Sequence, residues 1–219
     1  AGRITYKQDG NEVTGNDYFD YVVSDGDYTA NDTQSFAQGT TASSSRFNIE
    51  ILPANDKPTV AAPASLDIFT SGSTPVSVPG VSVADVDLDA ITTGQTDFLR
   101  VEVQVLDGSN NAVASGLISY TAADPSGESA YVNGKGSNSL IVQGTKAQVD
   151  AVLSTLTVAY SADRDVSNDK LRITVDDRLY DASGNLATGA NGGPTNADGT
   201  AVDATNNRVS KDITLRASN

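Results

Sequence analysis

The chain contains no cysteine and no histidine in its 219 residues. Without cysteine it forms no disulfide, no thiolate zinc site and no thiol nucleophile. Without histidine it lacks the commonest metal ligand and the commonest general base. The sequence also has no Gly-x-Ser-x-Gly elbow and no phosphate-binding loop, and no pair of its many aspartates is singled out as an acid and a base. We therefore expect a protein that is not an enzyme.

Basic residues are scarce as well, with 14 Lys and Arg against 28 Asp and Glu and a net charge of −14. Nucleic acids and anionic lipids need a cationic partner surface, so neither is an expected partner, whereas hard cations are. No apolar run approaches the roughly 18 residues that would predict membrane insertion. A cysteine-free composition rich in Asp, Asn, Gly and Thr favours a secreted bacterial or archaeal protein, and hence an extracellular or cell-surface location.

The hydrophobic residues alternate with polar ones in several short segments. Phe19, Tyr21 and Val23 do so, and so do Leu171, Ile173 and Val175. Period-two alternation is typical of strands that bury one side. Further strands are expected at 101–105, 139–142 and 157–160, with a hairpin turn at Asp107-Gly108 and Asn110-Asn111. The pattern predicts an all-β sandwich.

One segment has helical spacing instead. Thr145 and Gln148 have the form of a capping box, and Val149, Val152, Leu153 and Leu156 follow at intervals of one helical turn. This predicts a single short crossover helix near residues 145–155.

The sequence also repeats itself in part, since residues 17–55 can be laid over residues 169–219. Asp17–Asp25 matches Asp169–Asp177, with carboxylates at both ends and apolar residues at every second position. Phe47–Asn55 then matches Lys211–Asn219. Such self-similarity is the signature of a tandem array.

The Pro53–Pro58 linker places the expected domain boundary after residue 58. Residues 59–219 hold enough strands for a complete, enlarged sandwich, whereas residues 1–58 hold about three and lack an N-terminal half. That half could be removed by truncation, left out of a structure, or supplied by another chain. Segments 26–45 and 178–207 are expected to be long polar loops, and the second could bind a ligand with Tyr120 or Tyr180.

Three carboxylates stand at alternate positions, in Asp85, Asp87 and Asp89. In an extended segment they share one side, and Ca²⁺ accepts six to eight such oxygen ligands. Asn55 and Asp56 at the linker supply further oxygens. Asp17 and Asp25 are about 26 Å apart along one strand, so only one of them can reach the junction.

Four segments together resemble the cadherin-like, immunoglobulin-like tandem repeats of large bacterial surface adhesins, many of which are exported by type I secretion. These segments are 17–25, the linker Asn55-Asp56-Lys57-Pro58, Val83–Asp87 and the stretch from Gly144 to Tyr160. The resemblance implies calcium ligation between domains by Asn55, Asp56, Asp85 and Asp87, with Asp25 as a further ligand. Secondary candidates are Asp17, Asp89, Asp169, Asp176 and Asp177.

These observations predict an extracellular repeat module of an adhesin, rigidified by calcium at the domain junction and acting in surface adhesion, in biofilms or as an extender. Its partners would be neighbouring repeats of the same protein and possible cell-surface glycans or proteins. Two alternatives stay open. One is a self-assembling filament or matrix subunit, in which homo-association completes the first unit by strand complementation. The other is a glycan- or peptide-binding domain.

Overall fold

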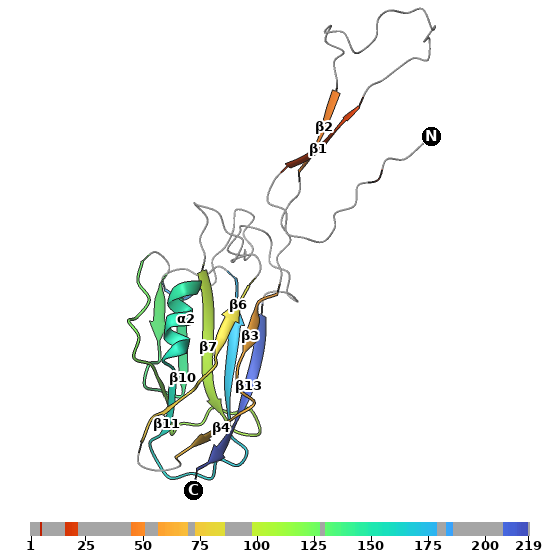
Figure 1. The fold of residues 1–219 in the computed structure, drawn as a ribbon. Coiled ribbons are helices and arrows are strands. Elements are labelled where there is room, and N and C mark those ends of the chain that lie inside the picture. Colours follow the sequence, from red (N-terminus) through yellow and green to blue (C-terminus); the bar gives the residue numbers. More distant parts are fainter. Residues whose placement is uncertain are drawn as a thin grey trace, which may run out of the picture. The chain divides into compact units, whose positions relative to one another are not determined.

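The structure is a computed structural model that describes residues 5, 16–21, 45–50, 57–69, 73–85, 98–127, 130–178, 183–185 and 208–218. The chain divides into two units, Ala1–Pro53 and Ala54–Asn219. Figure 1 shows both units. The division falls five residues before the boundary expected from the linker.

The described part of the first unit is one antiparallel pair of strands, β1 (Asn16–Tyr21) and β2 (Ser45–Glu50). Phe19 lies opposite Phe47, and their rings stack with centroids 5.3 Å apart. Cross-strand aromatic pairs of this kind stabilise a two-stranded ribbon, which is otherwise marginal in water.

The second unit begins with four short strands and continues with longer ones. The short strands are β3 (Thr59–Ala61), β4 (Ser65–Ile68), β5 (Val76–Ser77) and β6 (Ser82–Ala84). The remaining elements are β7 (Phe98–Leu106), β8 (Gly116–Ser119), β9 (Tyr131–Asn133), β10 (Ser139–Thr145), α2 (Lys146–Ser154), β11 (Thr157–Tyr160), β12 (Lys170–Asp176) and β13 (Arg208–Ala217).

These elements form two layers around one core, which confirms the predicted all-β sandwich with one short helix among the described residues. One layer is a six-stranded sheet in the order β4-β13-β12-β7-β10-β9. The other consists of the pair β3-β6, the helix, and the sheet β5-β11-β8. In Figure 1 the helix lies over β10 and β7 and beside β6.

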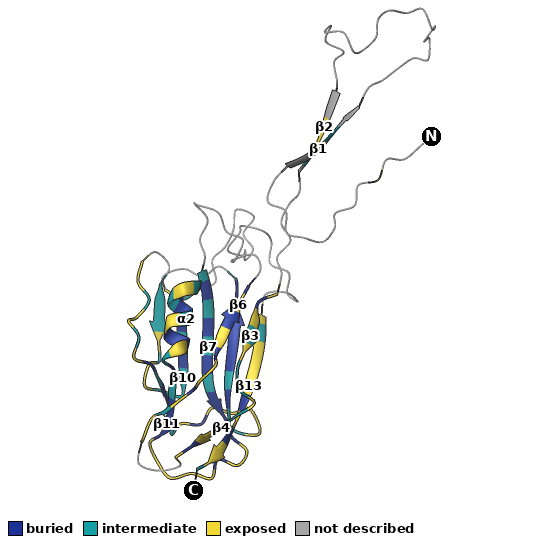
Figure 2. Cartoon of the chain, in the orientation of Figure 1, coloured by how far each residue is buried: buried dark blue, intermediate teal, exposed yellow. Residues whose placement is uncertain are grey.

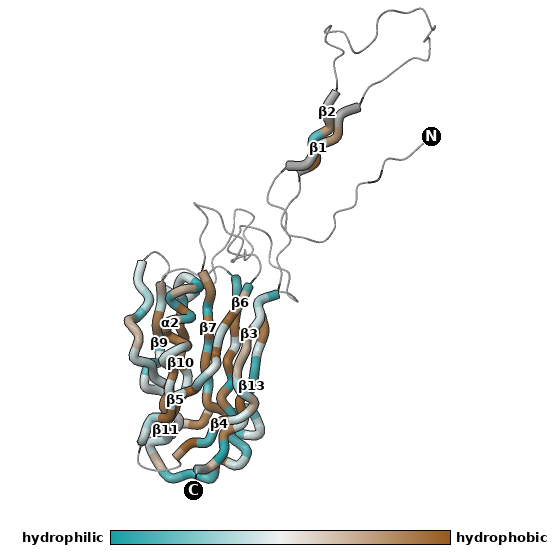
Figure 3. Tube along the Cα trace, in the orientation of Figure 1, coloured by the Kyte–Doolittle hydropathy of each residue, from teal (hydrophilic) through white to brown (hydrophobic). Residues whose placement is uncertain are grey.

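Alternation along the central strands creates the core. Leu99, Val101, Val103 and Val105 of β7 are buried, with at most 1% of each side chain exposed. They lie beside Leu171, Ile173 and Val175 of β12, which are equally buried. The alternation of these three residues in the sequence predicted that they face the core. Figure 2 shows the buried stripes along these strands, and Figure 3 shows that the same stripes are hydrophobic. The opposite side of the six-stranded sheet, here called the outer face, carries the polar residues between them.

The helix α2 begins as its sequence predicts. The Thr145 side chain accepts a hydrogen bond from the Gln148 backbone, and the Gln148 side chain accepts one from the Thr145 backbone. Val149, Val152 and Leu153 are buried against the sheet. The helix packs against β6, β7 and β10 and so covers the core over this part of the large sheet. At nine residues it is far too short to cross a bilayer, and the described residues include no helix that could.

The turn after β7 also forms where it was expected. The Asp107 carboxylate accepts hydrogen bonds from the backbone N–H groups of Ser109 and Asn111, at 2.8 and 2.9 Å. These bonds hold the pKa of Asp107 below its usual value. The antiparallel bridge that follows is a single pair, Leu106 with Ala112. The chain then crosses to the other layer, because β8 pairs with β11 rather than with β7.

The predicted repeat corresponds to two similar antiparallel pairs, β1 with β2 and β12 with β13. Their registers differ by two residues. Phe19 lies opposite Phe47, whereas the matching Leu171 lies opposite Ile213 rather than Lys211. A shift of two keeps the same side chains on the same side of the ribbon, so alternation alone could not reveal it.

Replacing Thr145 by Ala removes the hydrogen bond that the Thr145 hydroxyl accepts from the Gln148 backbone, and leaves the bond from the residue 145 backbone to the Gln148 side chain in place. We expect the free energy of unfolding to fall by about 1 kcal/mol in urea denaturation at neutral pH. The control is Ser154→Ala at the other end of α2, which should cost less than about 0.5 kcal/mol. Equal losses in the two variants would contradict a role for the cap.

The cross-strand pair Arg172–Asp212 gives a pH-dependent prediction. Arg172 donates two hydrogen bonds to the Asp212 carboxylate, at 2.7 and 2.9 Å, and this lowers the pKa of Asp212 below its model-peptide value of 3.8, with Lys170 adding to the effect. A lowered folded-state pKa stabilises the protein above pH 3.8, and the gain is lost as the pH falls through the folded-state value. Both side chains are partly exposed, so Asp212→Asn should cost no more than about 1 kcal/mol at pH 7.

The measurement is urea denaturation of the parent chain and the Asp212→Asn variant at pH 7 and at pH 2.5. The difference in unfolding free energy should be present at pH 7 and shrink toward zero at pH 2.5. A difference that stays constant with pH would mean that the ion pair is not its cause.

Candidate functional site

The end of the second unit at which the chain enters carries a buried carboxylate. Thr59 of β3 pairs with Ala84 of β6, and the residues that continue these two strands are Pro58 and Asp85. Asp85 is only 2% exposed and belongs to the inward row of β6, following Val81 and Val83 at alternate positions. The core-facing row of this strand therefore ends in a carboxylate.

A second buried carboxylate ends an inward row in the opposite layer. Leu171, Ile173 and Val175 of β12 face the core, and Asp177 follows at the next alternate position with 2% of its surface exposed. The strands β6 (yellow) and β12 (light blue) both point toward the end at which the chain enters (Figure 1). Asp85 and Asp177 thus lie at one end of the sandwich, one in each layer.

Asp176, next to Asp177, points the other way and lies on the outer face. It accepts two hydrogen bonds from the Arg178 guanidinium and one from the Arg178 backbone, and lies 4.0 Å from the guanidinium of Arg208. Arg208 also donates a hydrogen bond of 3.1 Å to Glu102 of β7. Asp176 therefore belongs to an arginine network, which sets it apart from Asp177.

Asp169 lies at the far end of β12, about 23 Å from Asp176 at the usual rise of a strand. Its buried carboxylate accepts hydrogen bonds from Tyr160, at 2.8 Å, and from Arg164, at 2.7 and 3.1 Å. Burial, with the hydrogen bond to Asp169 adding to it, raises the pKa of the Tyr160 phenol well above its usual value. The Asp169 carboxylate is thus already hydrogen-bonded within the protein. The sequence match between Asp17 and Asp169 did not indicate this.

The other predicted ligands lie outside what the structure describes. This holds for Asp25, Asn55, Asp56, Asp87 and Asp89, and for the side chain of Asp17. Among the described residues no group of three acidic side chains is close enough to hold a metal ion by itself. Of the predicted ligands, the structure buries Asp85, Asp176 and Asp177 at this end, and Asp176 is the one engaged by arginines on the outer face.

Tyr120, suggested by the sequence as a ligand-binding aromatic, is 3% exposed. Its hydroxyl donates a hydrogen bond of 2.7 Å to Asp124, and the Lys135 ammonium lies 3.9 Å from its ring centroid. Burial raises the pKa of the Tyr120 phenol. The expectation that Tyr120 presents its ring to a ligand is wrong, because the core and Lys135 cover it; Tyr180 lies outside the described residues.

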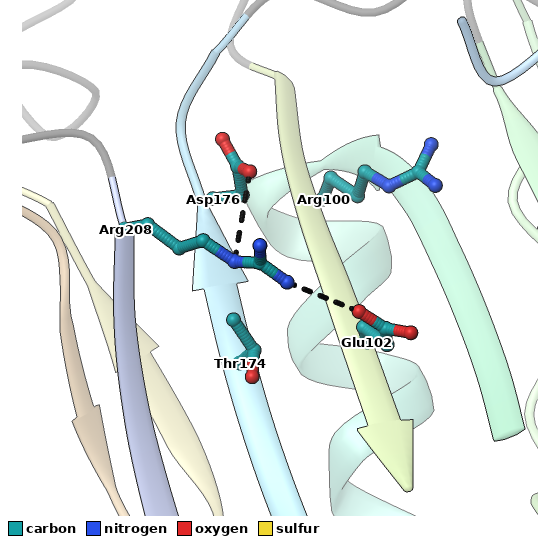
Figure 4. Close-up of a pocket in the computed structure, with 5 residues that line it drawn as sticks. All are labelled: Arg100, Glu102, Thr174, Asp176 and Arg208. Atoms are coloured by element: carbon teal, nitrogen blue, oxygen red, sulfur yellow. Dashed lines mark hydrogen bonds and ion pairs between the residues drawn. The ribbon is translucent and has the colours of Figure 1, made fainter. Parts of the chain in front are cut away.

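The structure reveals a site that the sequence did not indicate. A pocket of about 190 Å³ opens on the outer face of β7, β12 and β13 (Figure 4). Arg100, Glu102, Thr174, Asp176 and Arg208 line it. The alternate spacing of Arg100 with Glu102 and of Thr174 with Asp176 was visible in the sequence, but the order of the strands that brings them together was not.

Comparison with known proteins adds no assignment. No protein-family model matches the sequence, and a search of curated proteins found no match.

The network around Asp169 gives a prediction on stability. Asp169→Asn removes the charge that Arg164 and Tyr160 share, and we expect it to lower the free energy of unfolding by about 2 to 3 kcal/mol. Tyr160→Phe removes one donor only and should cost about 1 kcal/mol.

Urea denaturation at neutral pH measures both variants. Asp163→Asn is the control, since Asp163 is a nearby exposed aspartate, and it should change the unfolding free energy by less than about 0.5 kcal/mol. If Asp169→Asn is no more costly than this control, the network does not stabilise the fold.

Proposed function

We propose that the chain is a non-enzymatic extracellular repeat module of a bacterial adhesin, in which Ca²⁺ binds where the linker enters the second unit. The ion would hold neighbouring units in line and so stiffen an extended protein. The observation that supports this most directly is the pair of buried aspartates, Asp85 and Asp177, at that end of the sandwich.

The energetic argument starts from their burial. A carboxylate inside a protein is favourable only where hydrogen bonds and positive charge compensate its lost hydration. Here two such groups end the inward rows of facing layers, in a protein with a net charge of −14. A divalent cation at this end would add positive charge close to both carboxylates, beside the interactions that they already make within the protein.

Covalent geometry brings the remaining predicted ligands within reach. Asp56 precedes Pro58 by two residues, and Asp87 follows Asp85 by two. Consecutive Cα atoms are 3.8 Å apart, so each of these residues is at most about 8 Å from a described backbone position at this end. Asn55 is one residue farther. Together these side chains supply the oxygen-rich set that calcium needs.

The type of ligand favours calcium over other metals. Carboxylate and amide oxygens are the donors on offer, and zinc or copper would be expected to use the histidine or cysteine that this chain lacks. Magnesium retains most of its water and prefers fewer protein ligands. A set of Asp and Asn oxygen donors fits the larger coordination number of calcium.

Calcium titration of the chelator-treated chain tests the proposal. We expect heat of binding in calorimetry, a rise in the unfolding temperature, and a longer, stiffer particle in X-ray scattering. An ion that binds only the native state adds about 2.7 kcal/mol of stability at a free concentration one hundred times its Kd. Magnesium at the same concentration should produce a smaller change.

Single substitutions locate the ion. Asp85→Asn, Asp56→Asn and Asp87→Asn should each weaken calcium binding about tenfold or more, because each removes a charged ligand. Asp67→Asn is the matched control. Asp67 is an exposed aspartate of β4 whose partner is Arg216, and its replacement should leave the affinity unchanged. If the parent chain shows neither binding nor a change in stability at millimolar calcium, the proposal fails.

A further inference from the structure

Positive charge is concentrated on three neighbouring strands of this acidic protein. Strands β7, β12 and β13 carry six basic and three acidic residues, a net charge of +3. The rest of the chain then holds eight of the 14 basic residues and 25 of the 28 acidic ones, a net charge of −17. An anionic ligand would therefore meet repulsion over most of the protein and attraction at this part of the sheet.

The pocket lies within this cationic region. The pairing of β12 with β13 and with β7 places Arg208, Asp176 and Arg100 in one row across the outer face. Ser210, Thr174 and Glu102 form the row next to it. Asp176 and Thr174 are each 4% exposed, so the pocket has buried polar groups in its lining. Its volume of about 190 Å³ equals that of about six waters in the liquid, which is room for a single sugar ring.

Arg208 is held over this pocket by two carboxylates. Figure 4 shows its side chain reaching from β13 across β12 toward Glu102, with Asp176 on its other side. The side chain is still 53% exposed, and a guanidinium has five N–H donors. One of them donates to Glu102, so others can reach a ligand from the solvent side. Glu102 thus orients Arg208 without covering it.

Arg100, which lines the pocket on the β7 side, is itself held by a loop segment and an aromatic ring. Arg100 points away from Arg208 and donates a hydrogen bond of 2.9 Å to the Gly184 carbonyl (Figure 4). Its guanidinium also lies 5.9 Å from the centroid of the Tyr131 ring. Gly184 has a φ of +78°, and a Cβ there would come within 2.7 Å of that ring. Glycine is therefore required for this close approach.

We propose that this pocket binds one sugar residue of an acidic polysaccharide, with Arg208 donating to the sugar carboxylate. A guanidinium matches a carboxylate with two parallel hydrogen bonds. Glu102 and the Thr174 hydroxyl, which shares a hydrogen bond of 2.8 Å with the Ser210 hydroxyl, accept hydrogen bonds from sugar hydroxyls. This mixture of donors and acceptors suits a uronic acid better than a phosphate, because two carboxylates beside the arginines repel a more highly charged group.

Calorimetric titration with a tetramer of galacturonic acid tests the proposal, and an uncharged tetramer of galactose is the matched probe. Both titrations are run with chelator present, so that the result does not depend on the calcium site proposed above. We expect the acidic tetramer to bind in the micromolar-to-millimolar range and the uncharged tetramer to bind at least about tenfold more weakly, since it lacks the charge-assisted hydrogen bonds.

Variants on the same sheet distinguish specific binding in the pocket from general attraction to the positive charge of these strands. Arg208→Gln should weaken binding about tenfold or more. Arg216→Gln is the control, since Arg216 lies at the other end of the same strand, is similarly exposed at 58%, and pairs with Asp67 outside the pocket. Glu102→Gln is the most informative variant. It makes the region more positive, yet it removes the group that orients Arg208, so we expect weaker binding.

Amide chemical shifts recorded during the titration should change around Thr174, Arg208 and Glu102. Weaker binding in Arg208→Gln and Glu102→Gln, with Arg216→Gln close to the parent chain, supports the proposal. Equal losses in both arginine variants, or tighter binding in Glu102→Gln, would mean general charge attraction and overturn it. Equal binding of the two tetramers, or no binding at millimolar concentration, overturns it as well.

Discussion

Alternation along the strands is the constraint on which the rest of this structure depends. The core requires Leu99, Val101 and Val103 of β7 to face inward together with Leu171, Ile173 and Val175 of β12. Once these rows face the core, the residues that alternate with them along the same strands must lie on the outer face. A slip by one residue would exchange the two sets and place arginine and glutamate in the core.

The same constraint decides what appears at the ends and on the outer face of the sandwich. The inward rows of β6 and β12 continue to Asp85 and Asp177, so these carboxylates are buried at one end. The outward rows place Asp176 and Arg208 side by side. Adjacent residues such as Asp176 and Asp177 therefore belong to different surroundings, one to an arginine network and the other to the interior.

Local features of the fold could be predicted because local chemistry determines them. The capping box of Thr145 and Gln148 and the turn at Asp107 depend on groups within four residues of each other. Strand existence followed from period-two alternation in the same way. The order of the strands and the two-residue offset between the repeated pairs depend on packing between distant segments, and alternation is unchanged by such an offset.

For the candidate sites, the sequence identified Asp85 from its spacing with Asp87, but it could not distinguish Asp177 from Asp169. Those two residues were equivalent as acidic ends of one strand. In the structure the Asp169 carboxylate accepts hydrogen bonds from Tyr160 of β11 and from Arg164 in the loop before β12, and Arg164 balances its charge. The pocket between Arg208 and Glu102 could not be predicted from the sequence for a similar reason. These two residues are 106 positions apart, and only the packing of distant strands brings them together.

The parallel pairing of β4 with β13 has a mechanical consequence. Ser65–Ile68, near the start of the second unit, is hydrogen-bonded alongside Thr214–Ala217 near its end, and both strands run in the same direction. A tensile force applied between the start and the end of this unit pulls the two strands in opposite senses along their length. The load is then shared by all the hydrogen bonds between them at once, rather than breaking them one after another, as it would if the strands were peeled apart from one end.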